Sequence, residues 1–448
     1  MKRFSVLVTF LVVAAAYAQT PPIQPNTPDV KIPGQLNFPA PSDLAIGKQP
    51  LTADEAVAIA LKRQPAIGIA QGNLLSAQGR TEQAASDLLP SVTAAGSYSR
   101  STIFKGSSSG SLQSGGSFTS SVTADQLLFD FGRTRDLVRQ AQTSESAFNQ
   151  TLSRTQQTVA LAVRQAFYNY RQAIADEANT VANVANRQRQ LNEAQARLNS
   201  GLGEPGDLVS AKASLASASV SLLTARDSTI TSRILLAQLI GVDPRTPITP
   251  ASSSEAKLSE ESDLQQLVIE ALNSRPDIKA AKADVASAKY GVSYAQKGNL
   301  PRFSLSAGAG ARGTNDPLQT EDGVLSLNVS WDFMDSGFTA GQVKAARGSE
   351  VVAEQTLIQV SQQAVADVGQ AYLDVQSAVQ RVDLANVEVA NALEYVRIAE
   401  GRYTGGIGLF SDVTTAQTSL VSAQHDQTQA VADVERARAR LRTAIGRL

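Results

Sequence analysis

The residues whose types and spacing suggest a specific site lie at two glycine-rich turns that are 205 residues apart. They are Arg197, Gly201 and Asp207 at the first turn, and Arg402, Tyr403, Gly406 and Asp412 at the second. A glycine past the last helical turn commonly ends a helix, so each turn is expected to join two helices. Each aspartate could then cap the second helix, and each arginine, in a last turn, would favour the helix dipole. The chemistry that these residues offer is electrostatic.

Side chains for catalysis or metal binding are scarce. The chain has no cysteine, which excludes disulfides, thiolate metal sites and a cysteine nucleophile. Its one histidine, His425, lies in a helical stretch and is expected to be a solvated or lumen-facing helix residue. The sequence contains no glycine-rich phosphate loop, metal-ligand cluster or catalytic triad pattern. Neither a cofactor nor an enzymatic activity is therefore expected.

The composition excludes one class of partner and favours one class of fold. The chain has 448 residues, with 40 basic and 41 acidic side chains, so its formal net charge is −1. It lacks the positive charge that attracts nucleic acid, and no nucleic-acid partner is expected. Charged residues make up 18% of the chain and aromatic residues only 5%, while small helix-forming residues are abundant. This composition suits helices that pack closely over long distances.

The N-terminus has the pattern of a removable export signal, predicted at residues 1–18. A basic start precedes an apolar run from Phe4 to Ala16, and Ala16-Tyr17-Ala18 fits the small-x-small cleavage rule. No cysteine follows, so no lipid anchor is expected there. Residues 19–50 are rich in proline and are expected to form an extended arm. No later stretch resembles a transmembrane helix, so the exported protein would be soluble, surface-bound or a β-barrel.

The chain contains two copies of one unit, predicted at residues 51–250 and 251–448. Pro65 and Pro276 are 211 residues apart, as are Pro90 and Pro301. Later matches are 205 residues apart, and they include Gln165 with Gln370, Gly201 with Gly406, Asp207 with Asp412 and Gly241 with Gly446. A constant offset over many matches indicates a duplication. The change of offset means that the first copy carries six extra residues, expected around Gly106 to Gly116.

Each copy begins with helical segments and continues with two segments in which apolar and polar residues alternate. Thr52, with Glu55 three residues on, is a plausible N-cap of the first helix, and a proline separates it from the next one. Strands are predicted at 91–104 and 117–130, and at 302–312 and 323–334, long enough to cross a membrane when tilted. Alternation alone fits a half-buried hairpin of a soluble domain equally well. Four strands cannot close a barrel, so a membrane form requires several chains.

A very long helix follows each strand pair, predicted at 134–199 and 339–404. Apolar residues step by three and four through both in one heptad register, as at Val368, Tyr372 and Val375 in the second copy. Neither segment contains proline, and about 65 helical residues span roughly 100 Å. Return helices are predicted at 207–240 and 411–446. A stalk or scaffold coiled coil would show the same pattern.

The second turn, Arg402-Tyr403-Thr-Gly-Gly406-Ile-Gly-Leu-Phe-Ser-Asp412, resembles the hairpin signature of TolC-type outer-membrane efflux proteins, the outer membrane factors. The first turn is a looser version, and the resemblance covers nearly the whole mature chain. It implies a mainly α fold with a small β part, in which a helix–β-hairpin–long-helix hairpin unit is duplicated. It also implies a homotrimer, whose twelve-stranded outer-membrane β-barrel continues into a twelve-helix periplasmic α-barrel.

The resemblance further implies a function. The chain would be the outer-membrane channel-tunnel of a tripartite efflux or type I secretion system, with a long periplasmic part. It would passively conduct substrates from an inner-membrane transporter and a periplasmic adaptor protein to the exterior, and it would contact outer-membrane lipid. The alternative is a secreted or periplasmic coiled-coil scaffold or adhesin without channel activity.

By the same resemblance, the two turns would be periplasmic tips that dock the adaptor and gate the tunnel. Asp412 matches a ring aspartate of the entrance, whereas Thr415 stands where a second aspartate often lies. That departure argues against a doubled acidic ring and against strong cation selectivity. Asp207 and Arg402 match tip residues that would hold a closed state by a charge-assisted contact, released when the adaptor pulls the tips apart.

Overall fold

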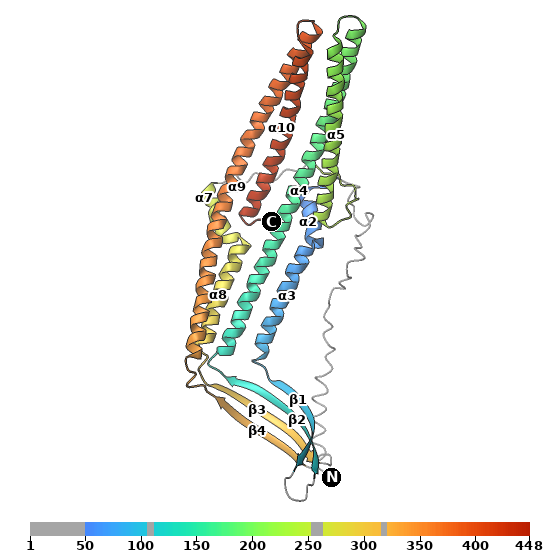
Figure 1. Cartoon of the computed structure of the whole chain (residues 1–448). Helices are drawn as coiled ribbons and strands as arrows, with labels where there is room; N and C mark the ends of the chain where they lie inside the picture. The colour runs from blue at the N-terminus through green and yellow to red at the C-terminus, as the bar shows by residue number, and fades with distance from the viewer. Residues whose placement is uncertain (1–49, 105–111, 252–262, 315–319) are drawn as a thin grey trace.

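The computed structural model describes residues 50–104, 112–251, 263–314 and 320–448 (Figure 1). The predicted signal peptide and nearly all of the proline-rich arm lie outside these ranges. Figure 1 shows an elongated chain, with four strands at one end and the tips of two helical hairpins at the other. The expected mainly helical fold with a small sheet is confirmed.

The two copies contain the same elements in the same order. The first has α2 (Ala53–Arg63), α3 (Pro65–Ser86), β1 (Ser91–Phe104), β2 (Leu112–Phe129), α4 (Arg133–Asn199) and α5 (Pro205–Ile240). The second has α7 (Leu264–Ser274), α8 (Pro276–Gln296), β3 (Arg302–Thr314), β4 (Thr320–Ser330), α9 (Phe338–Thr404) and α10 (Phe410–Ala444). Both α4 and α9 have 67 residues and run from the sheet to the tips.

Capping residues and prolines explain where the shorter helices begin. Thr52 and Glu55 form a capping box, in which each side chain accepts a hydrogen bond from the other residue's backbone N–H, at the start of α2. Pro65 and Pro276 occupy the first turn of α3 and α8. A proline fits there because its missing N–H would have no helical partner anyway.

The four strands form one antiparallel sheet in the order β1-β2-β3-β4, so the two copies join through β2 and β3. The register puts the apolar residues on one face, in rows such as Ala124, Ala307 and Leu325. The opposite face carries mainly serine, threonine and glycine. The outer edges of β1 and β4 pair with no described strand of the chain.

The six extra residues of the first copy lengthen its hairpin by three residue pairs. Strands β1 and β2 pair at 14 positions, from Ser91–Asp125 to Phe104–Leu112, whereas β3 and β4 pair at 11 positions. The number of residues between the last paired positions is the same in both hairpins. The insertion therefore extends the sheet and leaves the helices in register.

Strand β4 begins and ends earlier than the predicted segment 323–334, because it runs from Thr320 to Ser330. Its last pair is Arg302–Ser330, and Pro301 precedes Arg302. Proline has no N–H to continue the ladder, so the residues after Ser330 have no partner strand. The alternation that suggested a longer strand continues through Trp331 and Phe333 without backbone pairing.

A short aspartate turn joins each hairpin to its long helix. The Asp130 carboxylate accepts hydrogen bonds from the backbone N–H groups of Gly132 and Thr134, and Asp335 does the same in the second copy. Gly132 has φ 80° and its counterpart Gly337 has φ 86°, a conformation that favours glycine. This repeated turn fixes how the sheet meets the helices.

The core lies midway along the rod, where the short helix of each copy covers the long helix and the return helix. In the first copy Phe167, Leu236 and Ile240 are fully buried there. Leu441 of α10 and Ile445 directly after it, the counterparts of Leu236 and Ile240, are fully buried in the second copy. The heptad register thus marks the surface that the short helices cover.

One prediction from the sequence is wrong in detail. Helix α5 is long and apolar enough to cross a membrane by length and composition, although no such stretch was expected. Only 11% of its most apolar window is buried within the chain. Exposed side chains on the rest of the helix, such as Val209, Val220 and Leu223, therefore present an apolar surface that no described part of the chain covers.

Candidate gate at the helical tips

Both tips use the same backbone motif to end the long helix. At the first tip, the Gly201 N–H donates to the Leu198 carbonyl at 3.1 Å, and the Leu202 N–H donates to the Arg197 carbonyl at 2.9 Å. This is the Schellman arrangement, which needs a residue with positive φ after the helix. Gly201 supplies it with φ 76°. The turn therefore exposes Leu202 at its apex.

The second tip repeats this motif 205 residues later. The Gly406 N–H donates to the Tyr403 carbonyl and the Ile407 N–H to the Arg402 carbonyl, each at 3.0 Å. Gly406 has φ 75°. Ile407 is exposed, as Leu202 is at the first tip. The two tips thus share one backbone shape with an exposed apolar side chain at the apex, and the second tip also exposes Leu409.

Three predicted residues come together across the two tips. The Tyr403 hydroxyl, at the end of α9, donates to Asp207 Oδ2, in the first turn of α5, at 3.0 Å. The Arg197 guanidinium lies 4.7 Å from the centre of the Tyr403 ring, a cation–π distance. Its Nη1 also donates to the Thr404 carbonyl at 3.3 Å. The first hairpin thereby holds the end of the second hairpin's long helix.

Burial controls the ionisation of Tyr403. The side chain is buried between the hairpins, and its ring lies 5.5 Å from that of Phe410. Burial, together with the hydrogen bond to Asp207 and the negative charge of that carboxylate, raises the pKa of Tyr403 to about 12. The hydroxyl therefore stays protonated, as a hydrogen-bond donor, throughout the physiological pH range.

Two other predicted residues remain apart from this contact. Arg402 and Asp412 make no side-chain hydrogen bond or ion pair with any residue in the described ranges of the chain. Arg402 is exposed, and Asp412 is half-buried in the first turn of α10. The hydrogen bond that Asp207 accepts within one chain comes from Tyr403, rather than from Arg402.

The aspartates are not N-caps. The N-cap residues are Glu204 for α5 and Leu409 for α10, and neither makes a capping side-chain hydrogen bond. The helices begin earlier than predicted because Pro205 starts α5, and Phe410 packs on Tyr403 at the start of α10. Asp207 and Asp412 still lie in the first turn, where a carboxylate is favoured by the helix dipole.

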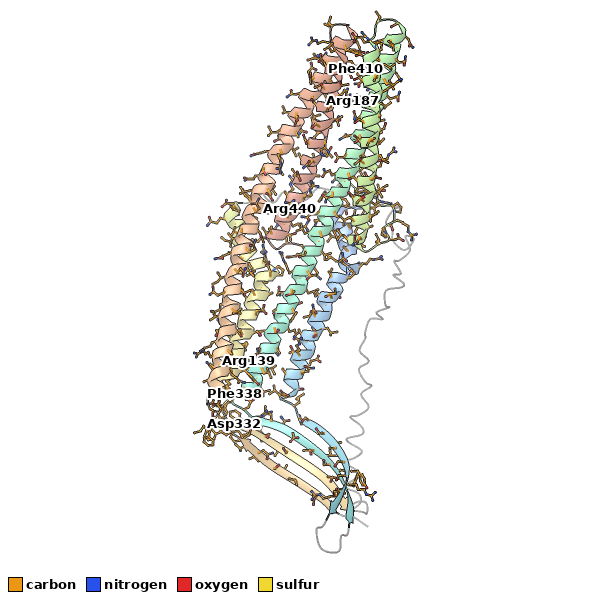
Figure 2. All side chains as sticks on the ribbon, viewed as in Figure 1. Arg139, Arg187, Asp332, Phe338, Phe410 and Arg440 are labelled. Carbon is orange, nitrogen blue, oxygen red and sulfur yellow. The ribbon has the colours of Figure 1, made fainter. Side chains whose placement is uncertain are left out.

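A polar cluster below the tips was not predicted. Arg187 is only 7% exposed, and its guanidinium donates to Gln190 Oε1 at 3.3 Å and to the Thr418 hydroxyl of α10 at 3.4 Å. Burial lowers its pKa. Figure 2 shows Arg187 near Phe410, at the tip end of the molecule. The heptad pattern could not reveal this cluster, because it does not say which helix α4 faces.

Comparison with known proteins assigns the family. A family model described as outer membrane efflux protein matches residues 56–242 and 267–447. These ranges include both hairpins, both long helices and both tips. The chain therefore belongs to the outer membrane efflux protein family, and its location is the cell outer membrane, with a long helical part in the periplasm.

Individual relatives agree with this assignment. Protein CyaE of Bordetella pertussis is 29% identical over 196 residues, which is 42% of this chain and 41% of that protein. The match thus spans less than half of the relative's length. Among solved structures, the outer membrane protein VceC of Vibrio cholerae is 22% identical with a TM-score of 0.76, covering 88% of this chain and 96% of that one. The Campylobacter jejuni CmeC outer membrane channel is 17% identical with a TM-score of 0.79, covering 88% and 85%.

Proposed function

We propose that three copies of this chain form a passive channel-tunnel through the outer membrane. The observation that carries this proposal is the four-stranded sheet with two unpaired edges and one apolar face. Open edges in a membrane would leave backbone N–H and C=O groups unpaired, which is prohibitively costly in lipid. If β4 of one copy pairs with β1 of the next, three copies close a twelve-stranded barrel.

The lateral faces of the helices support the same assembly. Helix α9 lies along one side of the chain, and α5 and α3 lie along the other (Figure 1). Large apolar side chains on both sides are more than half exposed, including Val220 and Leu223 of α5 and Val352 and Leu384 of α9. Packing α9 of one copy against α5 and α3 of the next would bury both surfaces. The twelve helices would then enclose a periplasmic α-barrel.

An aromatic band marks the level at which the barrel would leave the membrane. Trp331, Phe333 and Phe338 are exposed where the sheet meets α9, the region in which Figure 2 labels Phe338 and Asp332. Aromatic side chains favour the boundary between lipid and water. We place the periplasmic interface of the outer-membrane lipid at this junction.

The tips would be the gate and the adaptor-docking surface. The exposed apolar side chains of the turns are Leu202 at the first, and Ile407 and Leu409 at the second. A periplasmic adaptor protein linked to an inner-membrane transporter would dock there. The contact between Tyr403 and Asp207 would stabilise the closed state within each copy, and Arg402 would add a contact between copies. Asp412 would line the entrance.

The chain has no visible energy-coupling or catalytic pattern, so we propose that it conducts substrates of a tripartite efflux or type I secretion system without chemistry of its own. The competing function is a secreted or periplasmic coiled-coil scaffold or adhesin. Purification from outer membranes and planar-bilayer recording separate the two. The channel-tunnel predicts a detergent-stable trimer with single-channel currents, and a monomer or dimer without conductance would overturn it.

A further inference from the structure

The polar face of the sheet carries few charges, and their positions are uneven. Among described side chains on this face, the charged residues are Arg302 and Arg312 of β3, Asp322 of β4 and Asp125 of β2. Measured along β3, Arg302 lies at the helical end, Asp125 is level with Ser306, Asp322 with Gly310, and Arg312 lies beyond. The remaining positions of this face are occupied mainly by serine, threonine and glycine.

Three of these charges have a nearby charge of opposite sign. Arg302 interacts electrostatically with Asp130, just beyond the end of β2. Asp322 pairs with Gly310, two residues from Arg312 on the neighbouring strand, so this aspartate and Arg312 are diagonal neighbours. Such neighbours lie about 7–8 Å apart, close enough for the two charges to offset each other.

Asp125 differs, because neither the residues directly opposite it nor its diagonal neighbours are charged. Ser91 on β1 and Ser306 on β3 lie opposite, and the diagonal neighbours are Thr93, Ser304 and Gly308. The Ser306 hydroxyl donates to Asp125 Oδ1, and Asn328 of β4 donates to the same hydroxyl at 3.1 Å. A chain of hydrogen bonds across three strands thus points donors toward the Asp125 carboxylate and holds it at one level of the sheet.

We infer that Asp125 forms an acidic ring inside the barrel that makes the channel favour cations over anions at this level. The inference rests on the proposed trimer, in which the polar face lines the lumen and each copy contributes one Asp125. The ring lies within the barrel, and Asp412 lies at the opposite end of the molecule, at the tips (Figure 1). The two aspartates would therefore act at separate levels of the conduit.

The dimensions of such a barrel would let the three Asp125 carboxylates influence ions across the whole lumen. Twelve tilted strands about 4.8 Å apart give a backbone radius of about 12 Å, and small side chains leave a lumen of about 8 Å radius. The Debye length is about 8 Å at physiological ionic strength, so three carboxylates act across the whole lumen. Three charges at that distance would enrich monovalent cations over anions about five-fold, and more at lower salt.

The test is the reversal potential of the purified full-length protein in a planar bilayer under a KCl gradient. Wild type should favour K⁺, Asp125→Asn should move the reversal potential toward zero, and Asp125→Lys should shift it toward Cl⁻. Asp125→Glu is the matched control, since it keeps the charge and should retain the wild-type value. The shifts should grow as the salt concentration is reduced.

Block by a multivalent cation added on one side of the membrane distinguishes the Asp125 ring from Asp412 at the entrance. Hexaamminecobalt(III) added on the extracellular side should block the wild-type channel, and Asp125→Asn should weaken that block at least three-fold while Asp412→Asn leaves it unchanged. If wild type conducts but Asp125→Asn keeps the wild-type reversal potential and extracellular block, the inferred selectivity of the Asp125 ring is wrong. The proposed channel function would not be affected by that result. If wild type forms no conducting trimer, the proposed function and the ring fail together.

Discussion

Tyr403 at the end of α9 donates a hydrogen bond to Asp207 in the first turn of α5, with 3.0 Å between the hydroxyl and carboxylate oxygens. The two residues are 196 positions apart and belong to different copies of the repeat. Arg197 of the first copy packs against the same ring. The contact thus joins the two hairpins of one chain at their tips, which we propose to be the entrance of the tunnel.

Tyr403→Phe should shift the tips toward an open arrangement. The substitution removes the donor while keeping the ring, so Asp207 loses a hydrogen bond to a charged group. Such bonds contribute about 1.5–3 kcal/mol, which corresponds to roughly ten-fold or more in a closed-to-open equilibrium. Single-channel recording should show a larger mean conductance or a higher open fraction. Tyr395→Phe, at an exposed tyrosine of the same helix, is the control. Equal effects of both variants would show that the hydrogen bond from Tyr403 to Asp207 does not stabilise the closed state.

Asp412→Ala should weaken block by multivalent cations added from the periplasmic side, or raise conductance. The carboxylate forms no hydrogen bond or ion pair with a described residue, so its removal should change the charge of the proposed entrance with little effect on helix packing. Thr415→Asp, one turn further along α10, should strengthen the same block by adding a second ring. Unchanged conductance and block in Asp412→Ala would leave this residue with a role at the helix terminus only.

Gly406→Ala should destabilise the second tip. Gly406 has φ 75°, a left-handed conformation in which a side chain costs roughly 1–2 kcal/mol. Gly401→Ala is a matched control in the last turn of the same helix, where an added Cβ meets nothing within 4 Å. Helix propensity predicts that this control is neutral or stabilising by up to about 1 kcal/mol. Hydrogen exchange of the tip amides should rise in Gly406→Ala alone, and equal exchange in both would contradict the role of the turn.

The sequence was informative wherever the signal is local. Pro65 and Pro276 start helices, and Gly201 and Gly406 end them, because these residue types restrict or relax the backbone whatever their surroundings. Predicted long helices at 134–199 and 339–404 begin within one residue of α4 and α9. One local signal was overlooked, the Asp130-Phe-Gly132-Arg-Thr134 turn, which recurs 205 residues later from Asp335 to Thr339.

The contacts between distant segments could not be predicted. Heptad spacing shows which face of a helix is buried, but it does not identify the helix that covers it. The partner of Asp207 therefore appeared only in the structure, as Tyr403 rather than Arg402. Likewise, the start of α10 depends on the packing of Phe410 against Tyr403, so Asp412 lies inside the first turn instead of capping it.

Arg275→Ala should destabilise the middle of the rod. Arg275 is 2% exposed, and its guanidinium donates to Asp277, to Asp367 of α9 and to the Ala444 carbonyl of α10. Removing one partner of a fully buried ion pair costs about 3–5 kcal/mol, and the loss here should be smaller, because the Asp277 and Asp367 side chains are 23% and 34% exposed. Gln64, its counterpart in the first copy, makes one bond to the Leu239 carbonyl at 3.2 Å. Gln64→Ala should lower the melting temperature less, and an equal loss would contradict the ion-pair argument.

Lowering the pH should weaken the ion pair between Arg275 and Asp277. Burial alone would raise the pKa of Asp277, but the hydrogen bonds and positive charge of Arg275 outweigh it and lower the pKa below its usual value near 3.8. A carboxylate with a lowered pKa in the folded state stabilises above its unfolded pKa and loses that contribution as pH falls through the folded value. The melting temperature in detergent, measured from pH 7 down to pH 3, should therefore fall less steeply in Asp277→Asn than in wild type. Asp383→Asn, at an exposed position of α9, should keep the wild-type slope, and identical slopes in all three proteins would show that Asp277 contributes nothing to acid sensitivity.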